Sequence, residues 1–114
     1  MSIMNVADGF EQIFEYYRLD PNIQKMIEDH SLLIAIKFTD TKSLYMVSID
    51  HERILLETNS LSKKPDIRVR IKSEQVFLDL MNGKIPIREP FVKGKIIIVK
   101  GFGKIVKLYR KYVE

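Results

Sequence analysis

The chain has 114 residues, a net charge of +4 and 46% hydrophobic residues, which is the composition of one ordinary globular domain expected to span residues 1–114. It contains no cysteine, so disulfide frameworks and thiol catalysis are excluded. No apolar run approaches the ~20 residues of a membrane span, and the N-terminus does not have the pattern of a signal peptide, so we expect a cytoplasmic protein.

The first thirty residues predict two helices. Apolar residues at helical spacing, from Val6 to Tyr17, indicate an amphipathic helix over about residues 5–18. Asp20 and Pro21 are typical of an N-cap followed by proline in the first turn, so a second, short helix begins there.

The pattern then changes to that of strands. The segments LLIAIKF (32–38), SLYMVSI (43–49) and RILLETN (53–59) are separated by short polar stretches and predict three antiparallel strands joined by hairpins. In the middle segment Tyr45, Val47 and Ile49 alternate with Leu44 and Met46, so both faces of that strand carry apolar groups.

The second half predicts strand, helix, strand and helix. Apolar residues alternate with Arg68, Arg70 and Lys72 over 67–72, which indicates a strand with one solvated face. Ser73 is a suitable N-cap for a helix over 74–82, and Gly83 is a suitable C-cap. A fifth strand over 95–100 and a last helix over 104–113 complete an α+β arrangement.

The charge is distributed unevenly. Residues 1–30 carry two basic against six acidic residues, whereas residues 84–114 carry nine basic against two. A basic C-terminal third favours an anionic partner such as a phosphate, an acyl-CoA, a membrane surface or a nucleic acid, and a solvated basic face is the simpler interpretation. Nucleic acid is disfavoured, because the Phe and Tyr residues there fall on the apolar helix face instead of forming a stacking platform.

The glycines near the C-terminus do not form a nucleotide-binding loop. The stretch FVKGKIIIVKGFGKIVKLYRKY (91–112) has no Walker spacing, and the dinucleotide pattern that starts at Gly101 and Gly103 fails at Val106. We therefore expect a tight strand-to-helix turn in which small residues allow close approach. His30 and His51 have no metal-ligand spacing, so no catalytic centre, metal or cofactor is expected and the protein is not predicted to be an enzyme.

From Pro65 onward the sequence resembles the sterol carrier protein 2 (SCP2) family. The segment PDIRVRIKSEQVFLDLMNGKI (65–85) is similar to the strand–helix segment of that family, and the pattern continues through Phe91, Gly94-Lys95, Gly103 and Lys107-Leu108. The stretch FTDTKSLYMVSID (38–50) resembles a family hairpin. The sequence differs in having Lys100 where the family has glycine, in the position of Pro86, and in ending on YVE instead of a peroxisomal tripeptide.

The resemblance implies a five-stranded mixed β-sheet covered by helices, with an apolar tunnel between sheet and helices. It implies non-catalytic binding or transfer of a lipid, for example a fatty acid, an acyl-CoA, a sterol-like compound or an isoprenoid. The apolar residues expected to line the tunnel could equally be plain core; they are Met46, Phe77, Leu80, Met81, Phe91, Phe102, Ile105, Leu108, Tyr109 and Tyr112.

Two further expectations concern partners. Lys104, Lys107 and Lys111 share one side of the last helix and are candidates for contact with an anionic headgroup, a CoA phosphate or a membrane surface, or they are solvated surface. The alternative function is a regulatory or assembly module that binds a protein partner and has a vestigial tunnel. A large exposed apolar patch or a stable homodimer would favour that alternative.

Overall fold

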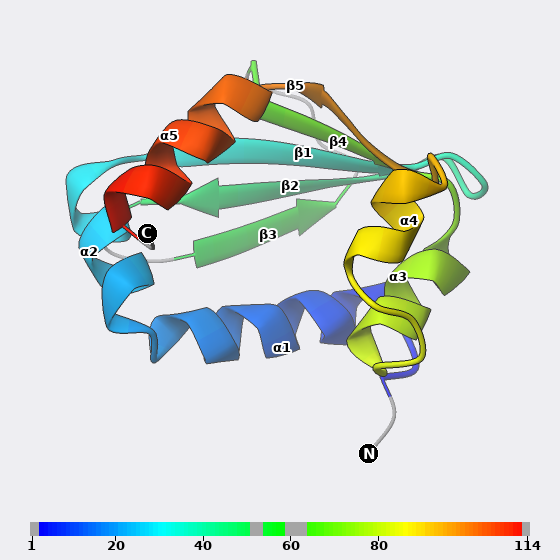
Figure 1. The fold of residues 1–114 in the computed structure, drawn as a ribbon. Helices are drawn as coiled ribbons and strands as arrows, with labels where there is room; N and C mark the ends of the chain where they lie inside the picture. The colour runs from blue at the N-terminus through cyan, green and yellow to red at the C-terminus, as the bar shows by residue number, and fades with distance from the viewer. Residues whose placement is uncertain (1–2, 51–53, 59–63, 113–114) are drawn as a thin grey trace.

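The computed structural model describes residues 3–50, 54–58 and 64–112, which form a five-stranded sheet with helices packed against it (Figure 1). The predicted α+β class and the mixed five-stranded sheet are confirmed. The elements in chain order are α1 (Val6–Arg18), α2 (Pro21–Asp29), β1 (Leu32–Phe38), β2 (Ser43–Ile49), β3 (Ile54–Thr58), β4 (Ile67–Ile71), α3 (Glu74–Met81), α4 (Arg88–Val92), β5 (Ile96–Lys100) and α5 (Phe102–Tyr112).

The strand order is β3-β2-β1-β4-β5. β1 pairs antiparallel with β2 and parallel with β4, whereas β4 pairs antiparallel with β5. Because side chains alternate between the two faces of a strand, residues in register with Ile34 and Ile36 face the helices. Residues in register with Ala35 and Lys37 face the opposite way, and we call that side the outer face.

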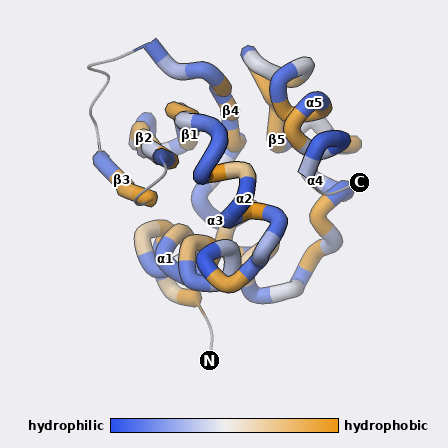
Figure 2. The backbone as a smooth tube through the Cα atoms, turned by 90° about the vertical axis from the view of Figure 1, so that its left-hand side faces the viewer, coloured by the Kyte–Doolittle hydropathy of each residue, from blue (hydrophilic) through white to orange (hydrophobic). Residues whose placement is uncertain are grey.

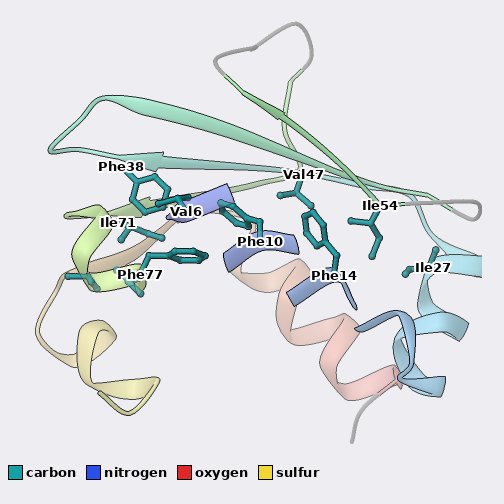
Figure 3. Packing of buried hydrophobic residues seen from close by; sticks show 11 residues of the cluster. Val6, Phe10, Phe14, Ile27, Phe38, Val47, Ile54, Ile71 and Phe77 are labelled. Atoms are coloured by element: carbon teal, nitrogen blue, oxygen red, sulfur yellow. The ribbon is translucent and has the colours of Figure 1, made fainter. Parts of the chain in front are cut away.

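The core lies between the inner face of the sheet and the helices α1, α2 and α3 (Figures 2 and 3). Phe10 of α1 stacks near Phe77 of α3, with ring centroids 4.9 Å apart, and Phe77 lies 5.8 Å from Phe38 of β1. Gly9 permits this approach, since a Cβ there would lie 2.5 Å from the Phe77 ring. Through this aromatic cluster, α1 and α3 pack against the centre of the sheet.

The helix boundaries follow the predicted signals. The Asp20 side chain accepts hydrogen bonds from the N–H groups of Asn22 and Ile23, at 2.9 and 3.3 Å, and the Ser73 hydroxyl accepts one from Val76 N–H at 3.2 Å. Gly83 has a φ of 71° just after α3, as expected for a helix C-terminus. The short helix α4 was not predicted, because five residues are too few to show a helical period.

The turn into α5 is built on one glycine. Gly101 has a φ of 88°, and a Cβ at this position would lie 2.5 Å from the backbone oxygen of Asp66, so the predicted close approach is confirmed there. Gly103, in contrast, lies inside α5, where an added Cβ would meet nothing within 4 Å. The last helix begins at Phe102, two residues before the predicted start, and Val113 lies outside the described residues.

The far end of α5 returns to α2. The Tyr112 hydroxyl donates a hydrogen bond to the Asp29 carboxylate at 2.8 Å, and its ring meets that of His30 edge-on at 5.7 Å. Among the described residues, no helix is long and apolar enough to cross a membrane.

Candidate functional site

The clearest candidate site is an apolar cavity between the helices α1 and α2 and the inner face of β1, β2 and β3. Its volume is about 240 Å³. Phe14, Val47 and Ile54 point into this end of the core (Figure 3). The described residues that line the cavity are all hydrophobic or aromatic: Phe10, Ile13, Phe14, Tyr17, Ile23, Met26, Ile27, Ile34, Ile36, Val47, Ile49 and Ile54.

The cavity opens partly to solvent on its helical side. Ile13, Ile23 and Met26 are half-buried, and Tyr17 is 41% exposed. Of the strand residues in the lining, Val47 and Ile54 are buried, whereas Ile34, Ile36 and Ile49 are half-buried. Tyr17 of α1 is therefore the most exposed residue of the described lining.

A second hollow adjoins the cavity on the other side of α1. It has a volume of about 230 Å³ and shares Ile13 and Tyr17 with the cavity. Its other lining residues are Gln12, Tyr16, Leu80 and Met81. The amide and hydroxyl groups make this hollow more polar than the cavity, so the two together offer an apolar compartment beside a mixed one.

Hydrogen bonds at both ends of α2 hold this helix in position beside the cavity. The Gln24 side-chain N–H donates to the backbone oxygen of Arg18 at 2.6 Å, which links the end of α1 to the start of α2. At the other end of α2 the Tyr112 hydroxyl binds Asp29. Burial raises the pKa of the Tyr112 phenol above its usual 10.0, and the hydrogen bond to Asp29 raises it further, so Tyr112 is a neutral donor at physiological pH.

The residues predicted from the sequence are dispersed in the structure, and the lining of the cavity includes none of them. Phe77 is buried in the aromatic cluster, and Met46 is buried in register with Ala35, on the outer face. Leu80 and Met81 line the more polar hollow. The other six lie on α4 or α5: Phe91, Phe102 and Tyr109 are exposed, Ile105 and Leu108 are half-buried, and Tyr112 is buried.

The three predicted headgroup lysines lie along α5. Lys104 forms an ion pair with Asp66 at 3.4 Å, and Lys111 lies 5.2 Å from the centre of the Tyr112 ring. Lys107 is exposed. Contact of these lysines with an anionic headgroup stays a prediction.

The described residues around the cavity provide an apolar interior. Within the described ranges, no three His, Asp or Glu side chains come together in a group that could hold a metal ion. Among the described residues that line the cavity, none is charged, and Tyr17 carries the one hydroxyl group. An interior of this kind can desolvate an apolar ligand.

The comparison with known proteins begins with the sequence. No protein-family model matches the chain, and no curated protein matches it either.

The solved structures do give matches. The structure of palmitated SCP2L2 from Aedes aegypti superposes with a TM-score of 0.61 at 16% identity, over 97% of this chain and 96% of that one. A Thermus thermophilus protein proposed to be a sterol carrier protein matches with a TM-score of 0.52 at 13% identity, over 86% of this chain and 69% of that one.

A larger enzyme contains a similar domain. A double mutant of the sec-alkylsulfatase Pisa1 of Pseudomonas sp. matches with a TM-score of 0.62 at 13% identity, over 82% of this chain. This chain spans only 16% of the sulfatase. At these identities the matches show the fold alone: the chain has an SCP2-like fold.

Proposed function

We propose that this chain binds a long-chain lipid without chemistry of its own, and that the lipid's apolar chain occupies the cavity under α1 and α2. The observation that carries the proposal is the apolar lining of the 240 Å³ cavity. The SCP2-like fold supports it, since the Aedes aegypti SCP2L2 structure with that fold was determined in palmitated form. Fatty acids, acyl-CoAs, sterol-like compounds and isoprenoids all offer such an apolar part.

The size of the cavity indicates partial burial of the ligand. Ligand pockets usually exceed ~300 Å³, and the cavity holds about 240 Å³. The adjoining hollow of about 230 Å³ would take the remainder, with the polar end of the lipid near Gln12 and Tyr16. A continuous tunnel would then form when Tyr17, which borders both spaces, turns aside.

The energetics favour a filled cavity. At ~24 cal/mol per Å³, an enclosed dry void of 240 Å³ would cost about 6 kcal/mol, and the open side makes this an upper limit. The stability of a whole domain is only about 5–15 kcal/mol. A lipid that fills the space therefore stabilises the folded chain, by an amount that rises with the logarithm of the free lipid concentration once this exceeds the Kd.

Native mass spectrometry of freshly purified protein, followed by organic extraction, tests the proposal. We expect a discrete lipid adduct, or an adduct after incubation with palmitate. A lipid-free mass that persists after incubation with fatty acids and acyl-CoAs would contradict it.

A pair of matched variants locates the ligand. Met26→Trp places a large ring in the cavity, whereas Met4→Trp adds the same ring at an exposed position. We expect palmitate binding to weaken about tenfold or more in the first variant, equivalent to about 1.4 kcal/mol, and to stay unchanged in the second. Equal binding by both variants would exclude this cavity as the ligand site.

The lysines of α5 are proposed to contact anionic membranes during lipid transfer. Lys104, Lys107 and Lys111 lie on one helix, and each basic residue near an anionic surface contributes about 1 kcal/mol. Replacing all three by Glu is expected to abolish binding to vesicles that contain phosphatidylserine. If the triple variant binds those vesicles as well as the unmodified protein does, the lysines are only solvated surface.

An assembly module remains the second candidate, and one observation favours it. Ile87, Phe91 and Val92 are exposed around α4, with exposed fractions of 73%, 43% and 82%. Such a patch suits a protein partner. A complex that forms through α4 and is lost in Val92→Glu, in a chain that binds no lipid, would replace the lipid proposal with this one.

A further inference from the structure

We propose that the outer face of the sheet carries a second binding site, for a small soluble phosphate-bearing anion, that is separate from the apolar cavity. A hollow of about 310 Å³ lies on this face, and we call it the outer cup. Among the described residues, its polar lining consists of four basic side chains, namely Lys37, Lys42, Arg68 and Arg70. Its volume is in the range of small-molecule sites.

The strand register brings the positive charges together. Lys37 of β1 lies directly opposite Arg70 of β4, and Ala35 lies opposite Arg68. Alternation along β4 then sets Arg68 and Arg70 on the same face, two residues apart. Like charges that face each other across strands are destabilising, so this arrangement has a cost in the unliganded protein.

The charges have no counter-ions within the described part of the chain. Neither Lys37, Lys42, Arg68 nor Arg70 forms an ion pair or a side-chain hydrogen bond there, and all four are exposed. Three carboxylates lie in the surroundings. Asp66, two residues before Arg68, forms an ion pair with Lys104 at 3.4 Å and accepts a hydrogen bond from Leu33 N–H at 2.9 Å. Asp40 belongs to the same turn as Lys42, and Glu57 lies three strands from Arg68, about 14 Å at the usual strand spacing.

Lys42 adds a second unfavourable feature at the same place. Its φ of 61° is the left-handed conformation, which is unfavourable for a residue other than glycine. Among the described residues it is the one non-glycine with positive φ. Gly, Asn or Asp would satisfy this turn more easily. A merely solvated basic face requires neither the strained lysine nor the like-charge pair.

The chemistry of the cup identifies its ligand class. Arginine binds phosphate through paired N–H groups, and lysine supplies a further point charge. The apolar residues of the described lining are Ala35, Leu44, Val69 and Val99, which suit the organic portion of a phosphate ester. No aromatic side chain appears among the described residues that line the cup, so base stacking of the kind used for single-stranded nucleic acids is missing.

The first test is a ¹⁵N–¹H NMR titration with sodium pyrophosphate at low ionic strength. We expect shift changes concentrated at the outer cup, around residues 35–44, 68–70 and 99. No localised change, or a change centred on the lysines of α5, would overturn the proposal. Binding of phosphatidic acid vesicles through the cup without binding of pyrophosphate would also overturn it, because the ligand would then be a membrane.

Matched variants distinguish specific binding at the outer cup from nonspecific attraction of the anion to a positively charged protein. Lys37→Gln/Arg70→Gln removes two charges from the cup, and Lys25→Gln/Arg88→Gln removes the same two residue types from exposed positions elsewhere. We expect pyrophosphate affinity to fall about tenfold or more in the first variant, since a bond to a charged group is worth about 1.5–3 kcal/mol, and by less than about twofold in the second, where salt screens distant charges. Equal losses in both would overturn the proposal.

A third variant provides a readout that does not depend on double substitution. Lys42→Asn removes one charge and replaces the strained lysine with a residue that tolerates positive φ. The expected result is weaker pyrophosphate binding together with a higher melting temperature. Unchanged affinity in this folded, stabilised variant would remove Lys42 from the site and contradict the argument from its strain.

Discussion

The connection between β5 and α5 allows a prediction that separates backbone strain from steric overlap. Gly101→Ala should be strongly destabilising for two reasons. An alanine at φ 88° costs roughly 1–2 kcal/mol. Its Cβ would also lie 2.5 Å from the Asp66 backbone oxygen, and relieving such overpacking costs roughly 1–3 kcal/mol. The sum is about 2–5 kcal/mol, a large part of the stability of a small domain.

Two other glycines serve as controls. Gly94 has a φ of 72° but open space around a Cβ, so Gly94→Ala should cost only the conformational part, about 1–2 kcal/mol. Gly103 lies in α5 with open space, so Gly103→Ala should be neutral or stabilise by up to about 1 kcal/mol. Urea unfolding measures the free energy of unfolding of each of the three variants. Equal losses at 101 and 94 would refute the role of the close approach to Asp66.

Two more predictions concern the helix contacts. Because the folded-state pKa of Tyr112 is raised above 10.0, the contribution of its bond to Asp29 is present below that pH and is lost as pH rises through the folded-state pKa. Tyr112→Phe should therefore reduce the alkaline loss of stability measured by urea unfolding, and the share of Tyr45, whose pKa is also raised by burial, should remain. Gly9→Ala should lower stability by up to about 2 kcal/mol, because the overlap with the buried Phe77 ring costs roughly 1–3 kcal/mol and the gain in helix propensity offsets roughly 1 kcal/mol of it. A higher melting temperature would show that the ring moves freely.

The order of elements was predictable because each signal is local. Asp20 and Ser73 were predicted as N-caps, and both cap a helix in the structure. The alternation along β4 correctly predicted a face with exposed Arg68 and Arg70. The parallel pairing of β1 with β4 joins segments far apart in sequence. No local pattern contains that information, and the mixed sheet was implied only by the family resemblance.

The candidate site was less predictable, for a physical reason. A cavity is a shortage of side-chain volume between elements, and hydrophobic periodicity shows only which residues face inward. Phe14, Ile27 and Val47 have the pattern of ordinary core residues, yet they border the cavity. The lining predicted from sequence came largely from α3 and α5, where the resemblance was strongest, whereas the cavity lies under α1 and α2.

The outer cup could not be predicted from the sequence either. Arg68 and Arg70 alternate visibly, but Lys37 joins them only through the register between β1 and β4, and the positive φ of Lys42 has no sequence signal of its own. The sequence does place Lys37 in one predicted strand and the alternating Arg68 and Arg70 in another. Pairing of these two strands could have suggested a shared basic face.

The most direct test of the central claim is paramagnetic NMR with a spin-labelled stearate whose nitroxide is near the end of the chain. If the acyl chain occupies the apolar cavity, the strongest line broadening should fall on residues such as Ile34, Val47 and Ile49, which line it. Broadening strongest at Ile105 and Leu108 of α5, with the cavity residues unaffected, would contradict the account and return the ligand to the site predicted from the sequence.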